Sequence, residues 1–178
     1  ASVGCEVGSV EEACAFGDIV VLAIPFGAIP ELPPAPFAGK IVIDANNYYP
    51  DRDGRIAELD AGRTTTSEIV ARHLASARVV KAFNAILERD IEKDALPPGV
   101  PNRRALPIAG DDAAAKALVA ALHDHLGYDV VDAGPLAQGA RFERARPAYC
   151  RRFDRAGLLA ALAEDGPNVA EGSWREAR

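Results

Sequence analysis

The strongest pattern in this sequence is a series of five short apolar runs, each followed by a turn. The runs are rich in Val and Ile, which is typical of strands that are buried on both faces of a parallel sheet. They predict strands at residues 18–24, 40–44, 79–83, 104–109 and 129–132. Ligands of open parallel sheets bind at the carboxyl ends of the strands, so the turns after these runs are where we expect a functional site.

Segments with helical signals alternate with these strands. Each segment begins at a residue that favours a helix N-terminus: Ser9 with Glu12, Thr65 with Glu68, Asp111, Pro135 and Asp154. The segment after Asp111 is the most regular, because leucine recurs there at every fourth position. The alternation predicts an α/β fold with a doubly wound, mainly parallel sheet.

Composition narrows the class of protein. The length of 178 residues is typical of one domain, which we expect at 1–165 and followed by a polar tail at 166–178. The net charge of −6 argues against nucleic acid as a partner. No apolar run approaches the length that crosses a membrane, so we expect no membrane partner. The three cysteines form no C-x-x-C pair, which favours the reducing cytoplasm.

Familiar catalytic and metal-binding patterns are missing from the sequence. No G-x-S-x-G nucleophile motif occurs. His123 and His125 lie two positions apart on a predicted helix and face different directions, so they cannot grip one ion, and His73 reads as a structural histidine. We therefore predict no metal site.

The turns after the first three strands carry better candidates. Asn46 and Asn84 offer amide groups that can hydrogen-bond a carboxamide or a ribose, although asparagine at a strand end is more often simply a turn former. Ile24, Pro25 and Ile86 offer apolar walls of the kind that hydride transfer needs, because water must be kept from the transferring carbon.

Several of these segments together resemble one enzyme family. The segments are DIVVLAIPFGAIPEL, KIVIDANNYYP, TTTSEIVARHLASARVVKAFNAI, PIAGDDAAAKALVAAL and DVVDAGPLAQGARFE. They resemble the 8-hydroxy-5-deazaflavin-dependent NADP oxidoreductases, which are related to the N-terminal domain of pyrroline-5-carboxylate reductase. The resemblance implies a Rossmann-type fold, hydride transfer between NADPH and a deazaflavin, a small-molecule substrate and a homodimer.

The resemblance also assigns residues to the cofactor. Ile24, Pro25 and Phe26 match the turn against the nicotinamide ribose, Ala45 and Asn46 match the next strand-end turn, and Asn84 and Ile86 match the turn beside the nicotinamide ring. Asn84 is thereby the candidate catalytic residue. Because hydride passes directly between two stacked rings, no side chain is required as an acid or a base.

The sequence departs from the family at its beginning. Family members start with a strand and a glycine-rich G-x-G-x-x-G turn, and no such motif occurs here, so we expect a chain truncated at its N-terminus. Two alternatives to the deazaflavin enzyme stay open at this point. One is an imine reductase of the pyrroline-5-carboxylate reductase type, and the other is a non-catalytic nucleotide-binding or degenerate module.

Overall fold

The fold is a single five-stranded sheet with helices on both faces. The computed structural model describes residues 4–164, so the predicted tail at 166–178 lies outside the described residues. The strands follow one another in the order β1-β2-β3-β4-β5. Their bounds are β1 (Ile19–Leu22), β2 (Ile41–Asp44), β3 (Arg78–Lys81), β4 (Ala105–Gly110) and β5 (Asp129–Asp132).

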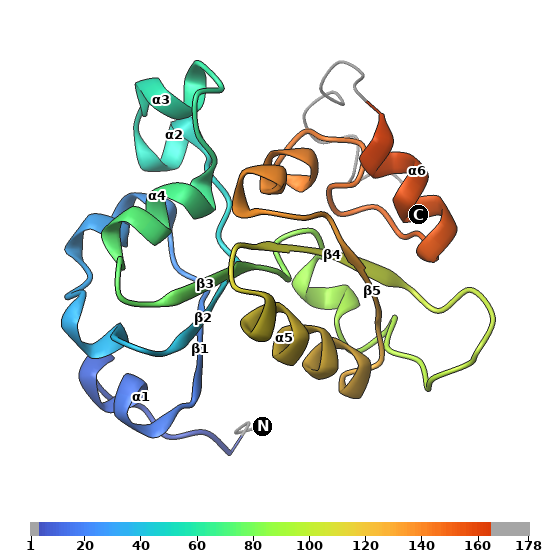
Figure 1. Cartoon of the computed structure of the whole chain (residues 1–178), viewed down its shortest axis with the longest axis horizontal. Coiled ribbons are helices and arrows are strands. Elements are labelled where there is room, and N and C mark those ends of the chain that lie inside the picture. The colour runs from blue at the N-terminus through green and yellow to red at the C-terminus, as the bar shows by residue number, and fades with distance from the viewer. Residues whose placement is uncertain (1–3, 165–178) are drawn as a thin grey trace.

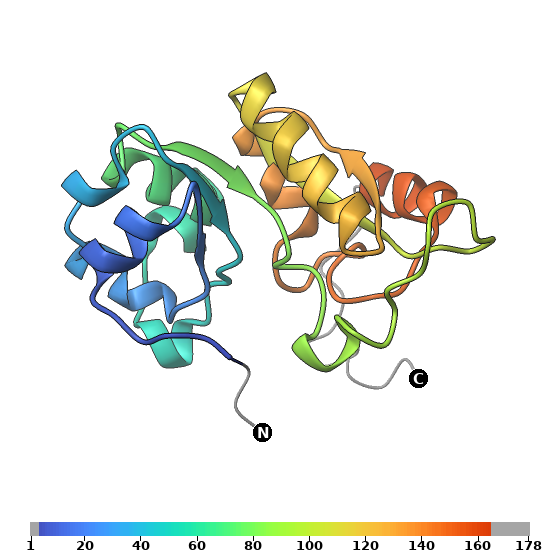
Figure 2. The same ribbon diagram turned by 90° about the horizontal axis from the view of Figure 1, so that it is seen from below.

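The molecule has two halves, the first built on β1, β2 and β3 and the second on β4 and β5, and the helices divide between them. The α-helices are α1 (Val10–Phe16), α2 (Pro50–Asp53), α3 (Ala57–Asp60), α4 (Thr66–His73), α5 (Ala113–His125) and α6 (Arg155–Ala163). The short 3-10 helices are η1 (Phe26–Glu31), η2 (Ala35–Phe37), η3 (Glu88–Asp90) and η4 (Leu136–Phe142). Figure 1 shows α1 to α4 beside β1, β2 and β3, while α5 and α6 accompany β4 and β5. The view from below separates the same two halves (Figure 2).

One strand pair gives the sheet its unusual layout. β1, β2 and β3 are parallel, and β4 and β5 are parallel to each other, but β3 and β4 are antiparallel. Only the last two residues of β3 pair with β4, with Val80 opposite Gly110 and Lys81 opposite Ala109. The carboxyl ends of β3 and β4 therefore meet, although the two strands run in opposite directions.

The predicted elements agree with these bounds to within a few residues. All five strands occur, the fifth with the predicted bounds, and both capping boxes form. The α/β fold with a mainly parallel, doubly wound sheet is thus confirmed. Two details of the prediction were wrong: Asp112, not Asp111, caps α5, and the helix after Pro135 is the 3-10 helix η4. Asp111 instead accepts a hydrogen bond from the Leu136 amide at 2.9 Å.

Alternate residues of the strands supply cores on opposite faces of the sheet. Ile41, Ile43 and Val80 pack with Val119 of α5 on one face. Val42 and Val79 point to the other face, where apolar residues of α1, α4 and η1 cover them. A third cluster lies beneath α6 and η4. No helix in residues 4–164 has both the length and the apolar character needed to cross a membrane.

A buried charged cluster joins the two halves where the strands end. Lys81, the last residue of β3, is fully buried, and its Nζ donates to Thr66 Oγ1 of α4 at 2.7 Å. The same ammonium lies 3.8 Å from Asp44 Oδ2 of β2 and 3.7 Å from Glu143 Oε1, just after η4. Since an unpaired charge is costly in the interior, this lysine fixes β2, α4 and η4 relative to β3.

The lysine stem explains a glycine in η4. A Cβ at Gly139 would lie 2.8 Å from Lys81 Cδ, closer than carbon atoms can approach. The stem has little freedom to move away, because its ammonium is held by Thr66 and by the Asn46 carbonyl at 3.4 Å. The absence of a side chain at residue 139 therefore lets η4 lie directly over Lys81.

A second buried ionisable group lies on the α5 face. His123 has no exposed surface, donates through Nδ1 to the Val119 carbonyl at 2.7 Å, and stacks on Phe83 with 3.9 Å between ring centroids. Burial lowers the pKa of His123 from 6.5 to about 4. The neighbouring His125 is exposed, so the two histidines do face different directions, as their spacing predicts.

Replacing Lys81 by methionine should destabilise the fold. Lys81→Met leaves Asp44 and the Glu143 oxygen without their buried cation, and we expect the free energy of unfolding to fall by about 3 kcal/mol in urea titrations. Lys93→Met is the matched control, because the Lys93 side chain is 76% exposed and a surface pair contributes less than about 1 kcal/mol. Equal stability of the two variants would contradict this account of Lys81.

His123 should make the protein less stable in mild acid. The unfolded chain binds a proton at this residue below pH 6.5, whereas the folded chain resists protonation until about pH 4. The unfolded state thus holds more protons between these pH values, and the free energy of unfolding falls as the pH drops, by up to about 3 kcal/mol.

Urea unfolding at a series of pH values checks this expectation. His123→Gln, which cannot be charged, should show a shallower decline than the wild type between pH 6.5 and 4, the range set by the two pKa values. His125→Gln serves as the control, since its exposed ring should leave the profile unchanged. Parallel profiles for His123→Gln and the wild type would show that His123 does not cause the decline.

Candidate functional site

The carboxyl ends of β1, β2 and β3 are joined by hydrogen bonds between the turns that follow them. The Ile24 amide donates to Asn46 Oδ1 at 2.8 Å, and the Ala45 amide donates to the Leu22 carbonyl at 3.0 Å. Asn46 in turn donates through Nδ2 to Asp44 Oδ1 at 2.7 Å. The structure therefore brings Ile24, Ala45 and Asn46 together, and it does so through the buried Asp44.

Asn47 connects this group to Asn84. Asn47 Nδ2 donates to the Asn84 carbonyl at 3.1 Å, and Asn84 Nδ2 donates back to Asn47 Oδ1 at 3.2 Å. Asn84 Nδ2 also donates to the Phe142 carbonyl at the end of η4 at 2.9 Å. The amide pair thus links the turn after β2, the turn after β3 and η4, and we call Ile24, Asn46, Asn47 and Asn84 the strand-end network.

The members of the network differ in their access to solvent. Asn46 and Asn84 are each only 2% exposed, whereas Ile24 and Asn47 are half-buried. Asn84 Oδ1 is buried and has no hydrogen-bond partner in residues 4–164. Since buried acceptors are normally bonded, this oxygen is the one group of the network that lacks a donor.

The other predicted site residues, Pro25, Phe26 and Ile86, lie outside the network and differ in their exposure and packing. Pro25 is exposed at the start of η1. Phe26 is 1% exposed and packs edge to face on Tyr48, with 6.2 Å between ring centroids. Ile86 is 7% exposed and packs on Leu106 in a separate cluster of the second half. Phe26 and Ile86 therefore belong to apolar cores on either side of the network.

Sequence reasoning missed a second link between the halves. Tyr49 Oη lies 2.8 Å from Tyr149 Oη, and the guanidinium carbons of Arg52 and Arg144 lie 4.9 Å and 5.0 Å from the Tyr49 ring centroid. Burial, with smaller contributions from Cys150 and Tyr49, raises the pKa of Tyr149. The Tyr149 hydroxyl consequently stays protonated and serves as a fixed contact.

The nearby thiol does not supply a nucleophile. Cys150 is buried, and this burial raises the pKa of its thiol to about 11, so almost no thiolate exists at neutral pH. No group of three or more His, Cys, Asp or Glu residues with metal-binding geometry occurs among the described residues. His73 contacts the Leu32 carbonyl at 2.8 Å, which fits its predicted structural role.

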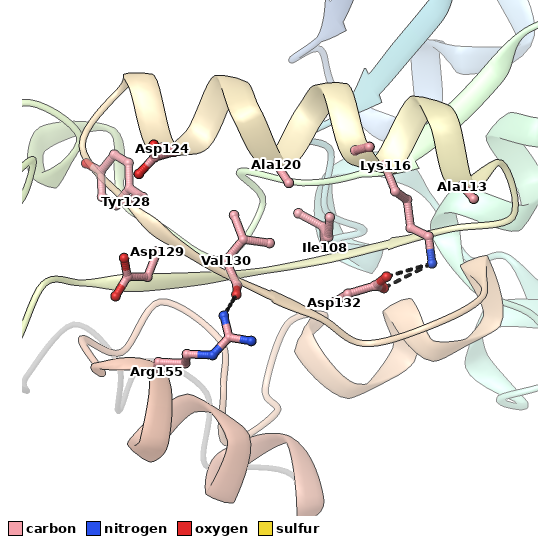
Figure 3. A pocket seen from close by; sticks show the side chains of 11 residues that line it. Ile108, Ala113, Lys116, Ala120, Asp124, Tyr128, Asp129, Val130, Asp132 and Arg155 are labelled. Atoms are coloured by element: carbon pink, nitrogen blue, oxygen red, sulfur yellow. Dashed lines mark hydrogen bonds and ion pairs between the residues drawn. The ribbon is translucent and has the colours of Figure 1, made fainter. Parts of the chain in front are cut away.

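Two cavities flank the described sheet. The larger, about 620 Å³, lies between α5 and the exposed edge of β5, and Figure 3 shows its side chains. Lys116 pairs there with Asp132 at 2.9 Å, and the Arg155 guanidinium donates to the Val130 carbonyl. None of its lining residues belongs to the strand-end network or is next to a network residue in the chain, so this cavity is not the predicted site.

The smaller cavity, about 460 Å³, adjoins the network. It is lined by Tyr48, the residue after Asn47, and by Glu143, the residue after Phe142. The remaining lining residues come from the 50–68 segment and from η4 with the turn after it. No residue of the strand-end network lines this cavity, but Tyr48 and Glu143 place it next to the turns that carry the network.

Comparisons with known proteins agree with this fold. Residues 1–48 match the family model of the NADP oxidoreductases dependent on coenzyme F420, a match that includes Ile24, Pro25, Phe26, Ala45 and Asn46. No curated protein matches the chain. A crystal structure of a candidate F420-dependent NADP reductase from Arthrobacter sp. FB24 is 24% identical, with a TM-score of 0.60 over 74% of this chain and 62% of that one. At this identity the likeness concerns the fold.

A second crystal structure is more similar in sequence. The hypothetical protein SMa0349 from Sinorhizobium meliloti is 30% identical and superposes with a TM-score of 0.67. The alignment covers 82% of this chain and 70% of the Sinorhizobium protein. This chain therefore belongs to the same protein family as SMa0349 of Sinorhizobium meliloti.

Proposed function

We propose that this protein is an NADP-dependent oxidoreductase that transfers a hydride between the nicotinamide and a flavin-like partner of the deazaflavin type. The observation that carries the proposal is the match of residues 1–48 to the F420-dependent NADP oxidoreductases, because this segment contains the first two strand-end turns. The strand-end network then joins those turns to Asn84, which follows the third strand.

The residues at the strand ends suit the nicotinamide end of the cofactor. Ile24 and Pro25 place apolar surface at the end of β1, and the half-buried Asn47, bonded to Asn84, follows the end of β2. The bound nicotinamide supplies the hydride, and apolar walls favour the transfer by excluding water. The protein's task at this site is to hold two rings in contact, which requires no acid or base.

Asn84 is a positioning residue in this proposal. Its Nδ2 holds Asn47 and the Phe142 carbonyl, and its unbonded Oδ1 suits an N–H donor such as a carboxamide. Asn46, which is equally buried, holds the Ile24 amide from behind. Phe26 and Ile86 support the network from the two apolar cores.

The helix N-termini of α1, α4 and α5 are poorly suited to bind the pyrophosphate of the dinucleotide. Phosphates bind where helix N-terminal amides are free, but in α1 the Ser9 and Glu12 side chains occupy these positions. Thr65 with Glu68 caps α4, and Asp112 caps α5. Acidic side chains at all three termini would repel a pyrophosphate.

The chain should accordingly bind NADPH weakly. We expect a dissociation constant above about 0.1 mM by isothermal titration calorimetry, since acidic side chains at the N-termini of α1, α4 and α5 disfavour the pyrophosphate. Nicotinamide mononucleotide, which lacks the pyrophosphate link, is the matched ligand and should bind with similar affinity. Micromolar binding of NADPH alone would show that the chain does hold the phosphates.

The proposed reaction is tested with the full chain, millimolar NADPH and an oxidised 8-hydroxy-5-deazaflavin. We expect NADPH oxidation that depends on the deazaflavin. Asn84→Ala should lower kcat/KM by about tenfold, a loss of about 1.4 kcal/mol of transition-state stabilisation, chiefly through kcat because the rings are misplaced. Gln138→Ala, an amide outside the network, is the control for the loss of a carboxamide.

Two outcomes would contradict the proposal. Equal rates for Asn84→Ala and the wild type would remove Asn84 from the site. Oxidation of NADPH with a cyclic imine but not with the deazaflavin would identify an imine reductase instead. The melting temperature of each variant, measured in the same buffer, separates a loss of positioning from a loss of folded protein.

A further inference from the structure

The cavity beside the strand-end network has the size and lining of a small-ligand site. Its volume of about 460 Å³ lies within the range of about 300–1,000 Å³ that is usual for such sites. Tyr48, Leu59 and Ala137 give it apolar surface, while Arg63, Glu143 and Arg146 give it charge. Which of these charges is already neutralised decides what the cavity can bind.

The acidic groups of the cavity all have partners within the protein. Asp60 accepts from Tyr48 Oη at 3.1 Å and pairs with Arg55 at 3.1 Å. Glu68 accepts from the Thr65 amide at 2.8 Å as part of the α4 capping box. Glu143 Oε1 accepts from Thr66 Oγ1 at 2.6 Å and lies 3.7 Å from the buried Lys81 ammonium.

Two of the basic groups of the cavity, in contrast, have no such partners within the described part of the chain. Neither Arg63 nor Arg146 makes an ion pair or a side-chain hydrogen bond with any residue in 4–164, although both line the cavity. Arg63 is exposed and Arg146 is half-buried. The third arginine, Arg144, packs against the Tyr49 ring. The cavity therefore carries two guanidinium groups whose charge no described carboxylate balances.

The larger cavity differs from the smaller one in this respect. Its acidic residues Asp124 and Asp129 both pair with Arg103, at 2.6 Å and 2.9 Å. Its basic residues are bonded as well, Lys116 to Asp132 and Arg155 to the Val130 carbonyl (Figure 3). Unbalanced positive charge thus distinguishes the cavity beside the strand ends in a chain whose net charge is −6.

We propose that the cavity beside the strand-end network binds a small organic anion, with its carboxylate or phosphate held by Arg63 and Arg146. A guanidinium presents several N–H donors in one plane, which matches the oxygens of either group. The apolar part of the anion packs on Tyr48, Leu59 and Ala137. The inference concerns binding alone and does not depend on the proposed hydride transfer.

The cavity is well placed to present such an anion to the strand ends. Tyr48 directly follows Asn47 of the network, and Glu143 directly follows Phe142, whose carbonyl accepts from Asn84. Glu143 is in turn fixed by Thr66 and Lys81, so this wall of the cavity is rigid. A bound anion would lie beside the network without disturbing its hydrogen bonds.

The test uses the full chain, labelled with ¹⁵N, and three small probes. Benzoate and phenyl phosphate are the anions, and benzamide is the neutral molecule with the shape of benzoate. We expect benzoate or phenyl phosphate to shift the amide signals of Thr64 to Thr66 and of Glu143 to Arg146, with a dissociation constant of about 1 mM. Benzamide should cause no saturable shift. The anion that binds more tightly identifies the group, carboxylate or phosphate, that the site prefers.

Charge-removing variants make the test specific. Arg63→Gln and Arg146→Gln should each weaken anion binding by at least about fivefold, since each removes one charge-assisted contact. Arg141→Gln is the matched control, because Arg141 is an exposed arginine of η4 that does not line the cavity. Raising the NaCl concentration from about 20 mM to about 0.5 M should weaken binding to the wild type as well.

Several results would overturn the inference. Equal binding of benzamide and benzoate would show that charge is irrelevant, and equal weakening by Arg141→Gln would show a non-specific effect of surface charge. Absence of saturable shifts with both anions at about 20 mM would show that the cavity is not an anion site. Dispersed amide spectra of the three variants, recorded before the titrations, establish that each is folded.

Discussion

The burial of the Lys81 ammonium is the constraint on which the arrangement of this protein depends. A charge without access to water costs several kcal/mol unless opposite charges and hydrogen-bond acceptors surround it. Here they come from three separate elements: Asp44 from β2, Thr66 from α4 and Glu143 from the turn after η4. None of these elements can shift without leaving the ammonium unpaired, so one side chain sets the position of both halves.

The antiparallel pairing of β3 with β4 gives this constraint its functional meaning. If β4 ran parallel to β3, the antiparallel contact between the ends of these two strands would not bring η4 to the end of β3. Because only the last residues of β3 and β4 pair, the chain that leaves β5 returns over the end of β3. Asn84 can then reach the Phe142 carbonyl at 2.9 Å, and the smaller cavity forms between the two halves.

Sequence patterns predicted the elements far better than their directions and partners. The apolar runs located all five strands and the capping boxes located α1 and α4, since both signals are local. The direction of β4 was not predictable, because a run buried on both faces reads the same in either direction. The lysine within the apolar run VVKAF is unusual, but its partners could not be predicted from the local sequence. Asp44 lies 37 residues before it and Glu143 lies 62 residues after it. The predicted Asn46 and Asn84 are connected through Asn47, but the contact of Asn84 with η4 was not predictable, because propensity alone does not place η4.

The strained turn after β3 explains why Asn84 faces the interior. Phe83 has a φ of 60°, which costs a residue with a Cβ about 1–2 kcal/mol. The stack of its ring on the buried His123, 3.9 Å between centroids, offsets part of this cost. The turn then directs Asn84 toward Asn47 and Phe142 instead of toward solvent. His123 on one face of the sheet and Asn84 at the strand ends are therefore connected through the backbone of Phe83, so the packing of a buried histidine bears on the geometry of the site.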